Sequence, residues 1–312
     1  MASHPSSAPS ASEPTPRIDS ELSALKDAVA VALEYAKTLG TTAAEVAISK
    51  QQGLSVSTRD KEVETVEFNK DGALGITVYR DGRKGNSSTS DLSPQAIREA
   101  VRAADGIAKY TSEDPFSGLA DPALMAQHIR DLQLYHPQDI NAQELAQLAI
   151  RAEAASLSVD SRIRNSDGAT ANAHTAAKVY GNSHGFLNGY CSSRYSLSCV
   201  VIGEESDGNM QRDYDYTVAR KYQDLLAPES VWLQAANKTL SRLDARKIAT
   251  AKMPVLFAPE IATGLMGHLI GAISGSSIYR KSSFLLDSLG TQVFSHCVNI
   301  AERPHILKGL AS

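Results

Sequence analysis

Apolar side chains recur at alternate positions through much of residues 43–90, and this spacing restricts how the chain can fold more than any other feature does. Alternation puts one face of an extended segment on a core and the other toward solvent. The pattern predicts four short strands, marked by Val46 and Ile48, by Leu54 and Val56, by Val63 to Phe68, and by Leu74 to Val78. Turns between them are predicted at Gly53, Asp60, Asp71-Gly72 and Asp81-Gly82. The small, polar residues 83–90 are expected to add an edge strand.

A second strand-rich block runs from Arg162 to about Val218, with glycines at its breaks. Its predicted strands cover residues 176–180, 186–190, 195–202 and 213–218. Short turns join antiparallel neighbours, because a parallel connection needs a long crossover. The apolar run at 254–257 is predicted to form one more short, buried strand.

Segments with apolar residues at helical spacing lie before, between and after these strand-rich blocks. Residues 22–36 carry an apolar stripe that begins after Ser20, a predicted N-cap, and ends before Gly40, a predicted stop. Four further helices are predicted: after Ser93-Pro94, from Asn141 to about Leu157, from Glu229 to Leu243, and from about Glu260 to Ile273. This order of elements indicates an α+β fold, in which antiparallel sheets carry helices packed on one face.

The chain is predicted to divide into three parts. Residues 1–19 are rich in Ser, Pro and Ala, so they are expected to form a disordered tail that cannot bury enough apolar surface to order itself. Residues 20–245 are expected to form an N-terminal α+β domain. The character of the sequence changes near Arg246, and residues 246–312 are expected to begin a C-terminal domain.

Charge and composition argue against several classes of function. The 31 Lys and Arg residues against 35 Asp and Glu give a net charge of −4, which argues against a nucleic-acid or anionic-membrane role. The first residues lack the apolar core of a signal peptide, and no apolar stretch reaches membrane-spanning length. Three cysteines without a C-x-x-C spacing indicate reduced thiols. We therefore expect a cytoplasmic protein.

No catalytic constellation is visible in the residues themselves. The sequence has no H-E-x-x-H zinc helix, and its eight histidines are scattered. His268 is alone on its predicted helix, which favours a packing role over a ligand role. Gly264, Gly267 and Gly271 lie inside that helix, which favours close backbone approach over a nucleotide site.

Several longer stretches carry a family resemblance. They include V-S-T-R at 56–59, V-E-F-N-K-D-G-A-L-G-I-T-V-Y at 66–79, Y-G-N-S-H-G at 180–185, G-Y-C-S-S-R at 189–194, A-T-G-L-M-G-H-L-I-G-A-I at 262–273 and H-I-L-K-G-L-A-S at 305–312. These stretches resemble the TldD/PmbA family, and in particular its PmbA (TldE) branch, from about Asp19 to the last residue. The resemblance implies a two-domain TldD/PmbA-like architecture.

The resemblance also implies where zinc chemistry would be found. In this family a TldD-type subunit holds a catalytic zinc on an H-E-x-x-x-H helix, whose glutamate polarises the attacking water. The corresponding segment here is residues 259–264, in which Glu260 matches the family glutamate. Pro259 and Thr263-Gly264 stand where the family has histidine ligands. Glu260 is therefore expected to be an inactive remnant, and the chain is expected to have no catalytic, cofactor-binding or metal-binding residue of its own.

The implied role is that of a non-catalytic subunit in a cytosolic metallopeptidase complex. Its expected partner is a zinc-bearing TldD-type subunit, and the expected substrates are small or unfolded peptides, with no nucleic-acid or membrane partner. Two alternatives remain open: a non-proteolytic module that binds peptides or proteins, and an inactive truncated remnant. The second arises because family members continue beyond the segment at 305–312, so the sequence is expected to be a natural truncation or a fragment.

Overall fold

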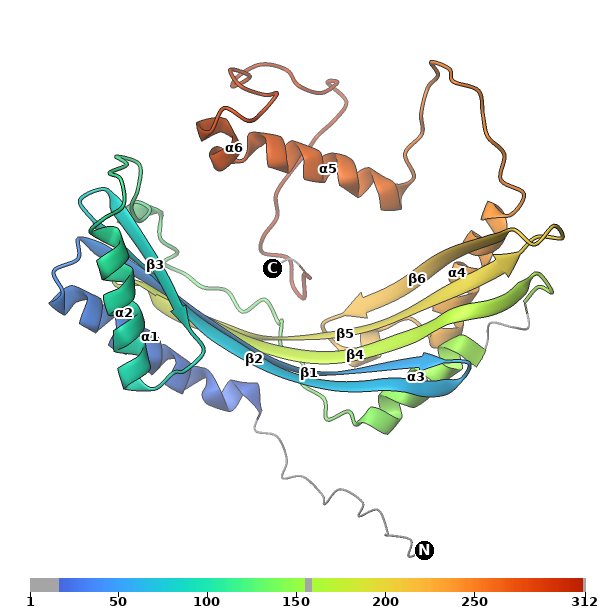
Figure 1. Cartoon of the computed structure of the whole chain (residues 1–312), viewed down its shortest axis with the longest axis horizontal. Helices are drawn as coiled ribbons and strands as arrows, with labels where there is room; N and C mark the ends of the chain where they lie inside the picture. Colours follow the sequence, from blue (N-terminus) through green and yellow to red (C-terminus); the bar gives the residue numbers. More distant parts are fainter. Residues whose placement is uncertain (1–16, 155–158, 311–312) are drawn as a thin grey trace, which may run out of the picture. The chain divides into compact units, whose positions relative to one another are not determined.

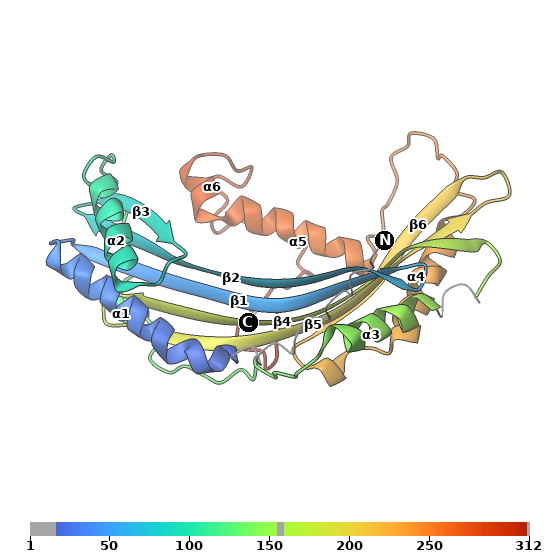
Figure 2. The same ribbon diagram turned by 60° about the horizontal axis from the view of Figure 1, so that its bottom comes forward.

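The computed structural model describes residues 17–154 and 159–310. These residues form two compact units: one contains the residues up to Asp244 and those from Pro304 onward, and the other is Ala245–Arg303. The first unit is a curved six-stranded antiparallel sheet with four α-helices on one face (Figures 1 and 2). This arrangement confirms the predicted α+β class.

The sheet has the strand order β3-β2-β1-β4-β5-β6, and every neighbouring pair is antiparallel. Its strands are β1 (Ala43–Arg59), β2 (Glu62–Arg80), β3 (Arg83–Thr89), β4 (Ile163–Asn182), β5 (Leu187–Glu204) and β6 (Met210–Ala219). The central pair β1–β4 joins the two strand-rich blocks into one sheet. The edge strand expected at 83–90 is present as β3.

The prediction of four short strands within residues 43–80 is wrong, because β1 and β2 are two long strands. The turns at Asp60 and at Asp81-Gly82 are confirmed, and all three residues have positive φ. Gly53 and Gly72 instead lie inside the ladder, paired with Asn69 and Lys50. In the second block, the predicted strands at 186–190 and 195–202 are likewise one strand, β5.

Gly53 has a reason other than a turn. A Cβ atom at this position would lie 1.8 Å from Nδ1 of His174, on the neighbouring strand β4. Glycine inside a strand often marks such a close approach. A local sequence pattern cannot separate this cause from a turn, because the atom that demands the glycine is far away in the chain.

The helices form two pairs on the same face of the sheet. They are α1 (Leu22–Thr38), α2 (Pro94–Ala108), α3 (Ala142–Ala154) and α4 (Pro228–Arg242), with short 3-10 turns at Ile18–Glu21, Pro122–Leu124 and Tyr222–Asp224. Ser93 caps α2 by accepting a hydrogen bond from the backbone N–H of Ala96, as predicted. The predicted cap at Ser20 is wrong: this residue lies in the first 3-10 turn, and its hydroxyl donates to the carbonyl of Arg17. The predicted end of α3 near Leu157 lies outside the described residues.

Two separate hydrophobic cores result from this pairing. The α1–α2 core packs those helices on one end of the sheet, around Val46, Ile76 and Val179. The α3–α4 core packs the other pair on the opposite end, around Leu197 and Trp232. Strands β1 and β4 contribute residues to both cores.

The second unit contains α5 (Pro259–Ile273) and α6 (Gly275–Tyr279), and the predicted helix from Glu260 to Ile273 is confirmed. The predicted buried strand at 254–257 is wrong: these residues have no regular structure, and Leu256 is 98% exposed. An apolar run becomes a strand only when a neighbouring strand pairs with it, and no described segment does so. Within the described ranges, no helix has both the length and the apolar character that crossing a membrane requires.

Candidate functional site

Glu260 lies in the first turn of α5, directly after Pro259. The hydroxyl of Thr263 donates to the backbone carbonyl of Glu260 at 3.0 Å. Residue 264, one turn on, is glycine, and a Cβ there would meet no atom of the described segments within 4 Å. His268 follows two turns after Glu260, about 12 Å along the helix axis. The helix therefore places no imidazole beside Glu260.

The described residues hold no cluster of three or more His, Cys, Asp or Glu side chains that could bind a metal ion. A catalytic zinc normally has three protein ligands and an open fourth position. The first turn of α5 offers only a carboxylate and a hydroxyl, so these residues do not fit the zinc site of the H-E-x-x-x-H type. The close packing expected at Gly264, Gly267 and Gly271 is not seen among the described residues, where no neighbouring atom lies within 4 Å of a Cβ built at any of them.

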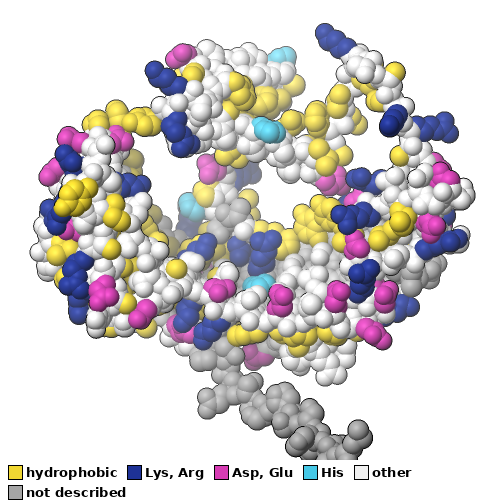
Figure 3. Space-filling view, in the orientation of Figure 1, with side chains coloured by type: hydrophobic (Ala, Val, Ile, Leu, Met, Phe, Trp, Pro, Cys, Tyr) yellow, Lys and Arg dark blue, Asp and Glu magenta, His cyan; other side chains and the backbone are white. Residues whose placement is uncertain are grey.

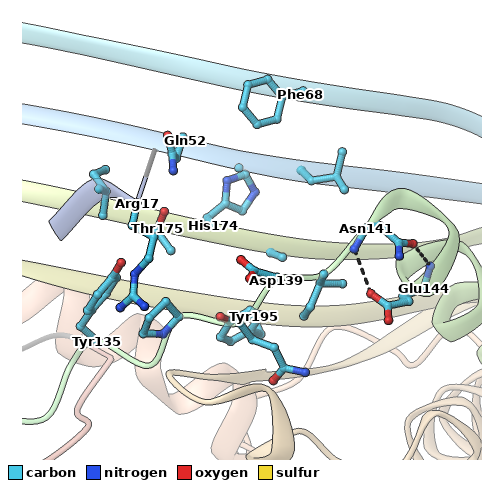
Figure 4. Close-up of a pocket in the computed structure, with 17 residues that line it drawn as sticks. Arg17, Gln52, Phe68, Tyr135, Asp139, Asn141, Glu144, His174, Thr175 and Tyr195 are labelled. Atoms are coloured by element: carbon cyan, nitrogen blue, oxygen red, sulfur yellow. Dashed lines mark hydrogen bonds between the residues drawn. The ribbon is translucent and has the colours of Figure 1, made fainter. Parts of the chain in front are cut away.

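A hollow of about 540 Å³ lies in the first unit between the two hydrophobic cores (Figure 4). Asn141 and Glu144 cap α3 reciprocally there: the backbone N–H of each donates to the side chain of the other at 2.9 Å. At the opposite side, Arg17 pairs with Asp19 at 3.0 Å, and the hydroxyl of Tyr135 donates to Asp19. These polar groups lie at the ends of helices, and Asp139 and His174 also line the hollow.

The opposite face of the sheet, which we call the polar face, carries the alternate residues of each strand. Ser55 of β1, Asn172 of β4 and Ser196 of β5 are directly in register there. The Ser55 hydroxyl donates to Oδ1 of Asn172 at 2.7 Å, and Nδ2 of Asn172 donates to the Ser196 hydroxyl at 3.1 Å. The polar face thus presents hydrogen-bonding groups at the spacing of a β-sheet.

His174 is next to this network and lies over Gly53. Its Nε2 is 3.4 Å from the Ser55 hydroxyl. Burial lowers the pKa of His174, and the positive charge of Arg194, directly opposite on β5, lowers it further. His174 was indistinguishable in the sequence from the other histidines. The sequence did place His174 and Asn172 on the same face of one strand, because they are two residues apart. It could not indicate which residues of β1 and β5 pair with His174.

Comparison with known proteins places this fold among metallopeptidase relatives. Three family models match: PmbA/TldA metallopeptidase domain 1 at residues 44–108, the central domain at 135–243 and the C-terminal domain at 250–312. Metalloprotease PmbA of Escherichia coli O157:H7 is 55% identical over 296 residues, which are 95% of this chain and 65% of that protein. The PmbA homolog of Haemophilus influenzae is 54% identical over 288 residues, 92% of this chain and 63% of that protein. The chain therefore spans less than two thirds of the length of either relative.

Solved structures show the same architecture. A putative modulator of DNA gyrase from Bacteroides thetaiotaomicron superposes with a TM-score of 0.84 at 25% identity, covering 92% of this chain and 66% of the other. TldE from Thermococcus kodakarensis superposes with a TM-score of 0.70 at 17% identity, covering 83% of this chain and 58% of the other. At 17% identity the second likeness speaks for the fold alone.

Proposed function

Because the chain belongs to the PmbA/TldD metallopeptidase family, we propose that it acts as a PmbA-type (TldE) subunit that pairs with a zinc-bearing TldD-type subunit. In this role the chain supplies no zinc ligand. The complex cleaves small or unfolded peptides in the cytoplasm, and the zinc chemistry belongs to the partner.

The observation that carries this proposal is the first turn of α5. Glu260 is present, but Pro259 precedes it, and threonine and glycine occupy the next turn. Neutral imidazole and carboxylate ligands at tetrahedral positions are what hold a catalytic zinc. Proline has no metal-binding side chain, and glycine has no side chain at all. A zinc-dependent reaction therefore needs ligands from outside the described residues.

The test is to co-express this chain with a TldD-type subunit and to separate the products by size-exclusion chromatography. Zinc content and cleavage of a fluorogenic peptide are measured on each peak. We expect a joint peak that contains one zinc per pair and all of the activity, and an isolated chain with neither. Tight zinc binding by the isolated chain, or failure of the two chains to associate, would overturn the proposal.

A matched variant locates the chemistry. Glu260→Gln removes the carboxylate and keeps the side-chain size, and we expect the joint peak to retain full activity with it. A loss of 100-fold or more, the scale on which an essential proton-transfer group acts, would assign catalysis to this chain instead.

A second candidate function rests on the edge of the sheet. Strand β3 pairs only with Leu74–Arg80, so residues 62–73 of β2 have no strand on that side among the described residues. Val63, Val66 and Phe68 of this segment are 47%, 52% and 56% exposed. An exposed edge with apolar side chains can accept an extended peptide by strand addition. This alternative predicts peptide binding without turnover even when the partner is present.

A further inference from the structure

Four basic side chains converge on the polar face. His174 of β4 is directly opposite Arg194 of β5. Tyr195 pairs with Ala219 at the end of β6, so the next residue, Arg220, comes alongside Arg194. Lys178 lies four residues after His174 on the same face of β4. Figure 3 shows Lys and Arg side chains gathered over the middle of this sheet.

A hollow of about 430 Å³ lies between these side chains. Ala176 and Ser192, which pair with each other, form its floor, and their small size leaves room above the sheet. Lys178, Arg194 and Arg220 are among the residues that line it. We call this space the Arg194 hollow.

Two of the cations of the Arg194 hollow, Lys178 and Arg194, have no acidic partner among the described residues. No carboxylate of the described residues lies within ion-pairing distance of Lys178 or Arg194. In the row of Ala176 the nearest acidic residue is Asp71, which is two strands away on β2. Burial lowers the pKa of Arg220, and the like charge of Arg194 lowers it further, which places the two guanidinium groups in each other's field.

Arg220 is held by hydrogen bonds to the backbone, whereas Arg194 has its hydrogen-bond donors available for a ligand. The guanidinium of Arg220 donates to the carbonyls of Ser193, Gly309 and Leu310 at 3.0–3.3 Å. Arg194 is exposed and makes no hydrogen bond within the described part of the chain. A planar guanidinium with free donors matches a carboxylate in two parallel hydrogen bonds, and a neighbouring lysine adds a third donor.

We propose that the Arg194 hollow binds the C-terminal carboxylate of an extended peptide. Arg194 and Lys178 hold the carboxylate, and the nearby serine and asparagine side chains of the polar face accept and donate hydrogen bonds along the peptide backbone. The choice of a peptide as the carrier of the carboxylate rests on the proposed function. The charge of the hollow requires only an oxyanion, so inorganic phosphate is the competing ligand.

The experiment measures fluorescence anisotropy of an N-terminally labelled alanine pentapeptide added to the whole chain without a partner. The peptide is used with a free C-terminal carboxylate and, separately, as the C-terminal amide. We expect the acid to bind at least tenfold more tightly than the amide. Arg194→Gln and Lys178→Gln should each weaken binding of the acid about tenfold or more, the effect of losing a charge-assisted hydrogen bond. Arg98→Gln, at an exposed arginine on α2, is the matched control and should change nothing.

Equal binding of the acid and the amide, no binding of either, or an unchanged affinity in Arg194→Gln would each overturn the proposal. Binding of inorganic phosphate without binding of the peptide acid would overturn it as well. Thermal melting of each variant confirms that the exposed substitutions leave the fold intact. Because the assay uses this chain alone, its outcome is independent of whether a TldD-type partner associates, which the chromatography experiment tests.

Discussion

The substitution Glu153→Gln is expected to destabilise the first unit strongly, because one buried carboxylate joins three elements. Glu153, on α3, is 2% exposed. It accepts the backbone N–H groups of Asp60 and Lys61 at 2.8 and 3.0 Å, in the turn between β1 and β2. It also accepts the hydroxyls of Ser166 and Thr58 at 2.5 and 3.3 Å.

Glutamine keeps the shape but turns one acceptor oxygen into an amide that points at donors. Each hydrogen bond to a charged group contributes about 1.5–3 kcal/mol, and a buried donor left without a partner costs about 1–3 kcal/mol. Losing at least one acceptor and the charge at the others gives an expected loss of about 3 kcal/mol in the free energy of unfolding. Urea titration followed by circular dichroism measures it, with exposed Glu34→Gln as the control, expected to stay within about 0.5 kcal/mol. A loss below about 1 kcal/mol for Glu153→Gln would refute the view that this carboxylate fixes the turn.

Three further predictions use other measurements. Lys61 has a φ of 66°, so Lys61→Gly should raise the free energy of unfolding by about 0.5–1 kcal/mol, measured by the same urea titration. The pKa of His174, measured by NMR, should lie below 6.5, and Arg194→Gln should raise it. Because the folded protein binds this proton less tightly than the unfolded chain, the contribution of His174 to stability is complete above pH 6.5. It is lost as the pH falls through the folded pKa. Burial, together with the charge of Glu153, raises the pKa of Cys199 to about 12, so a thiol reagent at pH 8 should label exposed Cys297 in the native protein and Cys199 only in denaturant.

The sequence predicted which faces of the strands are buried better than it predicted where the strands end. Alternation at Val46, Ile48 and Val56 correctly indicated core positions, because burial on one face follows from the period of the strand. The pattern around Gly53 predicted a turn, because a glycine needed for contact with His174 looks, locally, like a glycine needed for a turn. The run at 254–257 is not a strand, because apolar character alone does not supply a pairing strand.

The candidate sites likewise differ in how far the sequence could predict them. The lack of histidines around Glu260 is a local property of one helix, and the sequence was sufficient to find it. The Arg194 hollow combines side chains from β4, β5 and the residue after β6, so it exists only through cross-strand register. No spacing along one segment reports such a site, and Lys178 and Arg194 are unremarkable surface residues until the strands are paired.

The pairing of β1 with β4 also sets an order of events during synthesis. The first family model ends at residue 108 and so contains β1 and β2 but not β4. During synthesis, the edge of β1 that pairs with β4 therefore stays unpaired until residues 163–182 have left the ribosome. Such non-local pairing is slow to form, and an exposed strand edge invites association with other chains meanwhile. A nascent chain stalled near residue 110 should therefore be a better client for a holding chaperone than one stalled after β6. The segment that family models treat as a domain is thus not expected to be an independent folding unit.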